Sequence, residues 1–158
     1  MDISVEIGGL KVTRNPADRL ITYSLGTCLG VTIYDPVAKV AGLLHAQLPQ
    51  SSLNGQKALL MPSVFVDTGI PLLFEKAYQL GAEKKRIILK LAGATVKNEA
   101  DEFFKIGERN YIMARKLLWK NQVFISGEDV GGCIARTVSI DAATGIVTVK
   151  SGGVEKIL

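Results

Sequence analysis

The chain has 158 residues, of which 47% are hydrophobic, and 19 basic against 15 acidic residues give a formal charge of +4. This length and composition favour one globular domain spanning residues 1–158 over a disordered or fibrous chain. Residues 1–4 lack the basic and apolar start of a signal peptide. No segment reaches the roughly 20 apolar residues of a membrane span. We therefore expect a cytoplasmic protein with no membrane insertion.

Features that could bind a macromolecule are few. The basic residues gather only in short pieces, Lys84–Arg86 and the pair Arg115 and Lys116, without interleaved stacking aromatics. This pattern argues against a nucleic-acid partner and suits an acidic protein surface or an anionic membrane face. Phe103 and Phe104 are either a partner-binding anchor or, as we favour, part of the packing of the helix that follows.

Short strands dominate the first third of the chain. Strands are expected at residues 4–7, 9–13 and 20–23, followed by two alternating runs at 28–34 and 39–45. Pro36 suits the second position of a turn over residues 35–38, so the two runs predict an antiparallel hairpin. In that hairpin the expected pairs are Tyr34 with Lys39, Ile33 with Val40, Val31 with Gly42, Leu29 with Leu44, and Cys28 with His45. The aliphatic residues then share one face, and Cys28 and His45 share the other.

The remaining chain alternates helices and strands. After a polar loop at 49–56, a helix is expected at 68–80, with Thr68 as N-cap, Pro71 in its first turn and Gly81 at its end. The aliphatic segment 86–91 is expected to be a central strand, buried on both sides.

A second helix is expected from about 106 to 120, with Ile112, Leu117 and Leu118 on its apolar side. Strands follow at 123–126, 136–140 and 146–150, the last two paired across the turn at 141–145. Roughly eight strands and two main helices predict a sheet-dominated α/β domain. Its mostly antiparallel pairing argues against a doubly wound nucleotide-binding sheet.

Cys28 is a candidate nucleophile. It follows the small-residue turn 25–27, where main-chain N–H groups can point at the carbonyl under attack, as an oxyanion hole requires. Gly26 and Thr27 are therefore candidate oxyanion and substrate-binding residues, and Gly26 also removes side-chain bulk. The alternative is that Cys28 is a small buried hydrophobe, as free cysteines often are.

His45, the only histidine, is the candidate base. A free thiol is only a few per cent thiolate at neutral pH, and a neighbouring imidazole can take its proton. The alternative is a histidine that is buried and satisfied near the sheet. A third group usually fixes the imidazole tautomer. Thr22 and Ser24 precede the turn, and the hydroxyl or the main-chain carbonyl of Thr22 could accept the Nδ1 proton.

Metal binding is the main chemical rival. One histidine and two cysteines supply at most three soft ligands, without the spacing of a zinc motif, so we predict no metal and no cofactor. Cys28 and Cys133 are too few for a disulfide scaffold, and a bridge between them is not favoured in a reducing compartment. The glycine pairs at 131–132 and 152–153 indicate turns, because neither fits a phosphate-loop pattern.

Several motifs occur in a characteristic order. LGTCLGV at 25–31 is followed by DP at 35–36 and HAQLP at 45–49. Then come FVDTGIP at 65–71, KLAGA at 90–94, IGERN at 106–110 and EDVGG at 128–132. On these motifs the chain resembles CheD, the chemoreceptor glutamine deamidase family of bacterial and archaeal chemotaxis, over nearly its whole length. The residue before the cysteine, Thr27, stands where the family usually has serine.

The resemblance implies a layered α/β/β fold related to the catalytic domain of the cytotoxic necrotizing factor toxins. It also implies hydrolysis of receptor glutamine side chains to glutamate with release of ammonia. The family's nucleophilic cysteine, histidine and threonine fall on Cys28, His45 and Thr22. Two partners are implied, the cytoplasmic domain of a methyl-accepting chemotaxis receptor and the phosphatase CheC, which competes with the receptor.

We hypothesise that His45 deprotonates Cys28, which attacks the glutamine amide to give a thioester that water then hydrolyses. A receptor methyl ester presents a similar carbonyl, so a methylesterase side activity is expected. The alternative is a non-catalytic chemotaxis adaptor that binds CheC or receptor helices through the same groove.

Overall fold

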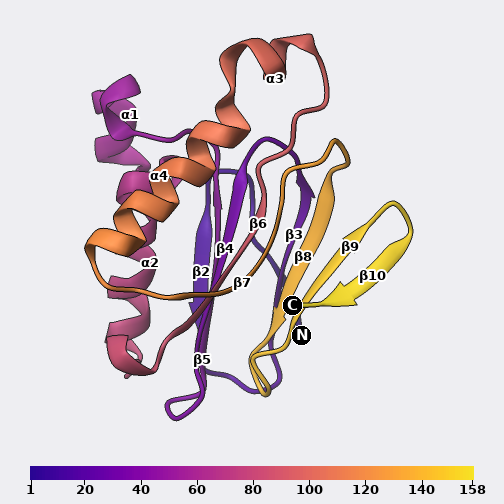
Figure 1. The fold of residues 1–158 in the computed structure, drawn as a ribbon. Helices are drawn as coiled ribbons and strands as arrows, with labels where there is room; N and C mark the ends of the chain where they lie inside the picture. The colour runs from indigo at the N-terminus through magenta and orange to yellow at the C-terminus, as the bar shows by residue number, and fades with distance from the viewer.

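Two five-stranded sheets lie face to face in the computed structural model of residues 1–158, and helices cover the outer face of one of them (Figure 1). The outer sheet has the order β1-β3-β8-β9-β10, formed by Asp2–Ser4, Arg19–Leu25, Arg136–Asp141, Val147–Ser151 and Val154–Ile157. The middle sheet has the order β2-β5-β4-β6-β7, formed by Leu10–Thr13, Val40–Ala46, Leu29–Asp35, Ile88–Gly93 and Ile125–Val130. The helices are α1 (Gly55–Leu60), α2 (Val66–Gln79), α3 (Glu99–Phe104) and α4 (Ile106–Lys120).

Antiparallel pairing dominates both sheets. Only β1–β3 and β6–β7 are parallel pairs, and the β8–β9 hairpin closes across the expected turn. The predicted layered α/β/β fold, with two main helices and mixed, mostly antiparallel sheets, is confirmed. Every helix is too short or too polar to span a bilayer.

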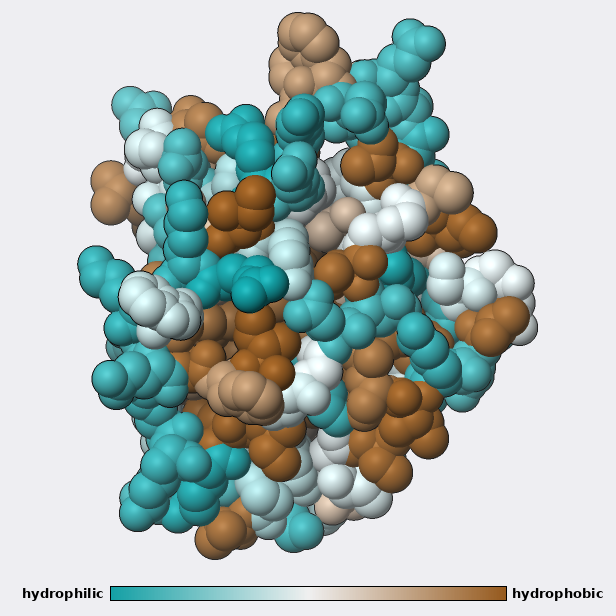
Figure 2. Space-filling view, viewed as in Figure 1, coloured by the Kyte–Doolittle hydropathy of each residue, from teal (hydrophilic) through white to brown (hydrophobic).

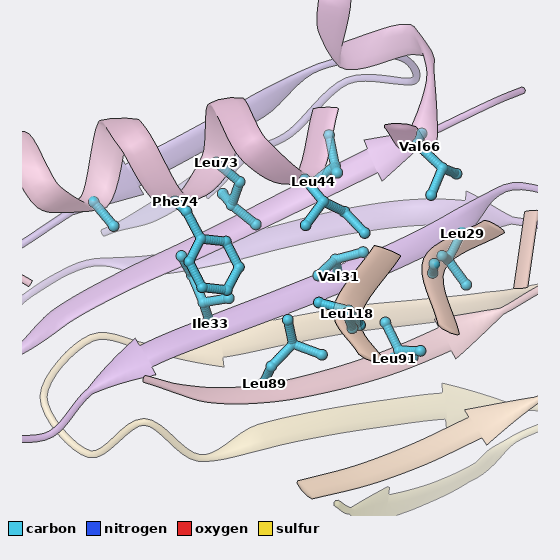
Figure 3. Close-up of a cluster of buried hydrophobic side chains, with 14 of the residues drawn as sticks. Leu29, Val31, Ile33, Leu44, Val66, Leu73, Phe74, Leu89, Leu91 and Leu118 are labelled. Atoms are coloured by element: carbon cyan, nitrogen blue, oxygen red, sulfur yellow. The ribbon is translucent and has the colours of Figure 1, made fainter. Parts of the chain in front are cut away.

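Two hydrophobic cores lie on opposite faces of the middle sheet. One core joins α2 and α4 to that sheet, and Figure 3 shows it between Leu73 and Phe74 of α2, Leu118 of α4 and the strands. The other core fills the space between the sheets. Because both faces of β4 and β5 are covered, every residue of these strands is buried.

The start of α2 differs from its prediction. The helix begins at Val66, and Thr68 is no N-cap, since its hydroxyl donates to the Pro62 carbonyl at 2.7 Å. Main-chain carbonyls of residues 48 and 49 accept from the first two N–H groups of α2, so no capping side chain is needed. Pro71 consequently lies inside the helix instead of in its first turn. Gly81, with φ +100°, follows the end of α2 as predicted.

Helix α4 has the predicted length, and two of its three predicted apolar residues are confirmed, since Leu118 is buried and Leu117 packs against the same core. Gly107, Asn110, Ala114 and Leu118 are buried, whereas Ile112 is 40% exposed, so the prediction for Ile112 is wrong. The six-residue helix α3, which precedes α4, was not expected, nor was α1, which begins at the end of the polar loop predicted at 49–56.

The favoured interpretation of Phe103 and Phe104 as packing residues is wrong. The two side chains are 79% and 58% exposed, and their rings contact each other edge to face at 5.0 Å between centroids. In the space-filling view, brown side chains project at the top, where α3 lies (Figure 2).

Several strand boundaries also differ from their predictions. The first strand is Asp2–Ser4 instead of 4–7, β6 begins only at Ile88, and β10 was not expected. Strand β6 lies inside the middle sheet, paired with β4 and with the edge strand β7, so the predicted interior position is confirmed. Its first residue, Ile88, is exposed, so the strand is buried only from Leu89 onward, with Lys90 half-buried. The glycine pairs at 131–132 and 152–153 have positive φ angles, consistent with turns.

Candidate active site

The hairpin of β4 and β5 forms, but its register differs from the prediction by two residues. Asp35 pairs with Val40, so the four-residue loop is 36–39 instead of 35–38. The Asp35 carboxylate accepts from the N–H groups of Val37 and Ala38 at 2.9 and 3.0 Å, which anchors the loop from the strand end. Lys39 completes the loop with φ +56°.

Cys28 is therefore not directly opposite His45. Gly30 occupies that place, and Cys28 lies in the bend 26–28, between β3 and β4. A shift of two residues conserves the face of every side chain, so Cys28 packs against the core between the sheets, the side that His45 also faces. In this structure His45 Nε2 accepts no hydrogen bond from the thiol.

Thr22 and His45 are joined directly by a hydrogen bond. Thr22 reaches His45 from β3 in the facing sheet, with 2.7 Å between Oγ1 and Nδ1. The same hydroxyl donates to the Val5 carbonyl at 2.8 Å, and a carbonyl can only accept. The proton between Thr22 and His45 therefore sits on Nδ1, which leaves Nε2 as an unprotonated acceptor. Of the two groups on Thr22 considered above, the hydroxyl makes the contact.

A β-bulge positions Thr22. Strand β3 carries one extra residue between Thr22 and Leu25 relative to β8. The extra residue lets Thr22 and Leu25, three apart, both face the core between the sheets. Ser24 lies in the bulge with φ +55° and is exposed, so it has no contact with His45.

Burial keeps both candidate catalytic groups neutral. Burial raises the pKa of the Cys28 thiol to about 11, opposed by a smaller effect of its own main-chain N–H. Burial also lowers the pKa of His45 to about 4. Near pH 7 the site thus holds a thiol and a neutral imidazole, and Nε2 is buried without a partner. A neutral imidazole with a bare nitrogen is the form that can accept a proton.

Three hydrogen bonds hold the bend that carries Cys28. The carbonyls of residues 26 and 28 accept from Thr95 N at 3.0 Å and Ala94 N at 2.8 Å. The carbonyl of Thr27 accepts from Asn110 Nδ2 at 3.0 Å. The N–H groups of Thr27 and Cys28 donate no hydrogen bond in return.

Sequence reasoning missed Thr95 and Asn110. Asn110 ends the motif at 106–110, but nothing in its spacing indicates that its side chain turns toward Thr27. Cys28 and Cys133 are both free, and no three His, Cys, Asp or Glu side chains gather as a metal site would require.

Together, these features define a layered α/β/β protein with a candidate nucleophilic site, in which a buried Thr22–His45 pair lies near a half-buried cysteine. A family model described as CheD chemotactic sensory transduction matches residues 47–151, and the chain belongs to the CheD family. Thr22, Cys28 and His45 precede the matched segment.

The sequence similarity to known proteins extends over nearly the whole chain. A relative in Syntrophus aciditrophicus, "Probable chemoreceptor glutamine deamidase CheD 1", is 51% identical over 152 residues, covering 96% of this chain and 95% of the relative. "Probable chemoreceptor glutamine deamidase CheD" of Solibacter usitatus is 38% identical over 156 residues, covering 99% and 92%. Among solved structures, the Bacillus licheniformis hypothetical protein YfiH matches with a TM-score of 0.48 and 16% identity, over 77% of this chain and 49% of that chain.

Proposed function

We propose that this protein is a glutamine deamidase that converts specific glutamine side chains of chemotaxis receptors to glutamate, with Cys28 as nucleophile. The observation that carries the proposal is the Thr22–His45 hydrogen bond, which leaves Nε2 bare on the side of the middle sheet that Cys28 shares. The printed names of the two relatives support the substrate class.

The first half of the proposed reaction forms a thioester. Cys28 Sγ bonds to the glutamine amide carbon as its proton moves to His45 Nε2, and the carbonyl oxygen becomes an oxyanion. The unpaired N–H groups of Thr27 and Cys28 stabilise that oxyanion, and Gly26 leaves room for the substrate. The C–N bond then breaks, and His45 returns the proton to the departing ammonia.

The second half regenerates the thiol. Water attacks the thioester carbon while Nε2 takes one of its protons, the C–S bond breaks, and Nε2 returns that proton to the departing sulfur. The products are the Cys28 thiol and a glutamic acid side chain, which ionises to glutamate. No step needs a metal or an organic cofactor. Burial raises the pKa of the Cys28 thiol and lowers the pKa of His45, which supports a proton transfer that accompanies the attack. The same steps would hydrolyse a receptor methyl ester.

The test is mass spectrometry of a receptor cytoplasmic fragment incubated with the purified protein. Conversion of one glutamine to glutamate adds about one mass unit, and Cys28→Ala should abolish it while still binding the fragment. Cys133→Ala is the matched control, because Cys133 is exposed and should retain full activity. Unchanged conversion by Cys28→Ala would exclude the cysteine mechanism.

A second candidate function is a non-catalytic adaptor, favoured by the exposed pair Phe103 and Phe104 on α3. The family resemblance implies CheC as a partner, and we propose that this exposed pair forms part of the CheC contact while catalysis stays at Cys28. Replacing both phenylalanines by serine should weaken CheC binding at least about tenfold, since exposed aromatic anchors often dominate an interface. Deamidation without CheC should be unchanged. An adaptor would instead show binding and no conversion.

A further inference from the structure

Asn110 connects two segments that flank the proposed nucleophile and base. It lies on α4 and is fully buried. Its Nδ2 donates to the carbonyl of Thr27 at 3.0 Å and to the carbonyl of Gln47 at 3.0 Å. The first carbonyl immediately precedes Cys28, and the second follows His45 by two residues. One amide group thus ties both segments to the same helix.

The contact with Thr27 sets the direction of the next N–H group. The Thr27 carbonyl and the Cys28 N–H belong to one peptide unit, and in a trans peptide they point in opposite directions. With the carbonyl held toward α4, the Cys28 N–H points away from the helix. The Cys28 N–H donates to no main-chain carbonyl, so it is available to the oxygen of a carbonyl that the adjoining sulfur attacks.

The surroundings of Asn110 are rigid. A Cβ on Gly107, one helical turn earlier, would lie 2.6 Å from the Thr95 carbonyl, so α4 packs directly against the segment that holds the bend. Asn110 Oδ1 is buried and accepts no hydrogen bond, and an unpaired buried oxygen is unfavourable compared with an apolar side chain of the same shape. The two hydrogen bonds that Nδ2 donates are therefore the reason for an asparagine at this position.

We propose that Asn110 is a positioning residue that orients the Cys28 N–H as an oxyanion donor. This inference rests on the proposed deamidase function. The neighbouring carbonyls of residues 26 and 28 are held by main-chain N–H groups, so Asn110 is the only side chain among the three donors. The bond from Asn110 is therefore the one of these three hydrogen bonds that a side-chain substitution can remove.

The test compares Asn110→Ala with Asn121→Ala in a Cys133→Ser background. Asn121 follows the same helix, and its side chain donates only to the Leu117 carbonyl, at 2.8 Å. We expect Asn110→Ala to lower the kcat of deamidation by about 10- to 100-fold with KM changed less than about threefold. Alkylation of Cys28 by iodoacetamide should change less than about twofold, because displacement at a saturated carbon develops no oxyanion. Asn121→Ala should match the parent in both assays.

A second variant separates positioning from folding. Asn110→Asp has nearly the same shape, and burial against two carbonyl oxygens favours its protonated carboxyl, which keeps one O–H donor, so it should be less impaired than Asn110→Ala. As the pH rises and the carboxyl ionises, that donor is lost, and its activity relative to the parent should fall. A purely structural role predicts that alkylation and kcat fall together in both variants, which would overturn the inference. Unchanged kcat in folded Asn110→Ala would also overturn it.

A binding measurement that needs no turnover tests the role of Asn110 separately from the proposed deamidase function. A peptide with an aldehyde in place of the glutamine amide adds the Cys28 thiol across its C=O bond, with sulfur bonding to carbon and the proton ending on oxygen. Asn110→Ala should weaken this reversible adduct by about tenfold or more relative to Asn121→Ala. Equal aldehyde affinities would contradict the role of Asn110. A parent protein that binds the aldehyde but does not deamidate receptor glutamines would contradict only the proposed function.

Discussion

At the residue scale, a hydroxyl holds the histidine where a carboxylate often does. Thr22 orients His45 without adding a negative charge, so nothing offsets the effect of burial, and the pKa of His45 falls to about 4. The imidazole is then a neutral base throughout the neutral range. With its pKa raised to about 11 by burial, the Cys28 thiol is protonated near pH 7, which limits its reactions with other molecules.

The titration of His45 can be measured without ambiguity, because the chain has one histidine. We expect NMR of the imidazole protons to give a pKa of about 4 instead of 6.5. Since the unfolded chain binds the proton at higher pH than the folded one, the free energy of unfolding should decrease as pH falls from 6.5 toward 4. The decrease is on the order of 2–3 kcal/mol. A titration midpoint at or above 6.5 would contradict this environment.

Thr22 can be tested with a pair of variants. Thr22→Val preserves the shape but removes the acceptor for the Nδ1 proton, so the tautomer is no longer fixed. Deamidation should fall by about 100-fold, the lower end of the contribution of general acid–base catalysis. Thr22→Ser restores the hydroxyl and should keep most of the activity. Equal activity of the valine and serine variants, both folded by circular dichroism, would show that the hydroxyl is not needed.

At the element scale, the end of β6 supports the bend at Cys28. Gly93 closes this strand with φ +102°, and a Cβ there would lie 2.5 Å from the Cys28 carbonyl. Backbone atoms cannot move aside as flexible side chains do. The strand end and the bend are thus one rigid unit, completed by the hydrogen bond from Ala94.

Gly93→Ala should therefore damage both stability and activity. We expect a loss of about 2–4 kcal/mol in the free energy of unfolding, from the strained φ together with the clash. Gly153→Ala is the matched control, with φ +79° and nothing within 4 Å of its added Cβ. It should lose only the smaller strain energy and keep its kcat. Urea unfolding and deamidation assays measure both effects, and equal losses in the two variants would contradict the clash.

At the scale of the whole molecule, the middle sheet is buried on both faces. Adjacent residues of β5 point into different cores, Leu44 toward the helices and Leu43 toward the outer sheet. Both are fully buried. Three layers therefore hold His45 between the sheets, away from water.

Leucine truncations test this arrangement. Leu43→Ala and Leu44→Ala should each lower the free energy of unfolding by about 2–5 kcal/mol, because each leaves a cavity in a packed core. Leu59→Ala in α1 is the control, since that side chain is 86% exposed and should change stability by less than about 0.5 kcal/mol. Chemical denaturation provides the comparison. An unchanged free energy of unfolding in Leu43→Ala would mean that the outer sheet does not cover this face of the middle sheet.

The hydrophobic alternation of the strands predicted which side of the sheet each residue faces, but it did not predict which residues contact one another. The alternation in 28–34 and 39–45 places Cys28 and His45 on one side whichever of the two registers forms, so the sidedness survived the two-residue error. The register itself depends on Asp35, which is held in the strand by an ion pair with Arg86, 51 residues away, at 2.9 Å. Such long-range contacts have no local signal.

The third member of the site illustrates the same limit. Thr22 was a candidate from its position before the turn, yet it reaches His45 across the two sheets, by way of a bulge that no alternation pattern reveals. The contacts of Asn110 depend on how α4 packs over the bend. The short helices α1 and α3, with six residues each, carry too few periodic positions to be recognised.

The most direct test of the central claim is intact-mass analysis of the protein quenched in acid during turnover of a receptor glutamine peptide. A thioester mechanism predicts a transient adduct whose mass is that of the peptide less ammonia, located on the fragment containing Cys28 and absent from Cys28→Ala. Turnover at the parent rate by Cys28→Ala, or an adduct confined to Cys133, would contradict the assignment of Cys28 as the nucleophile.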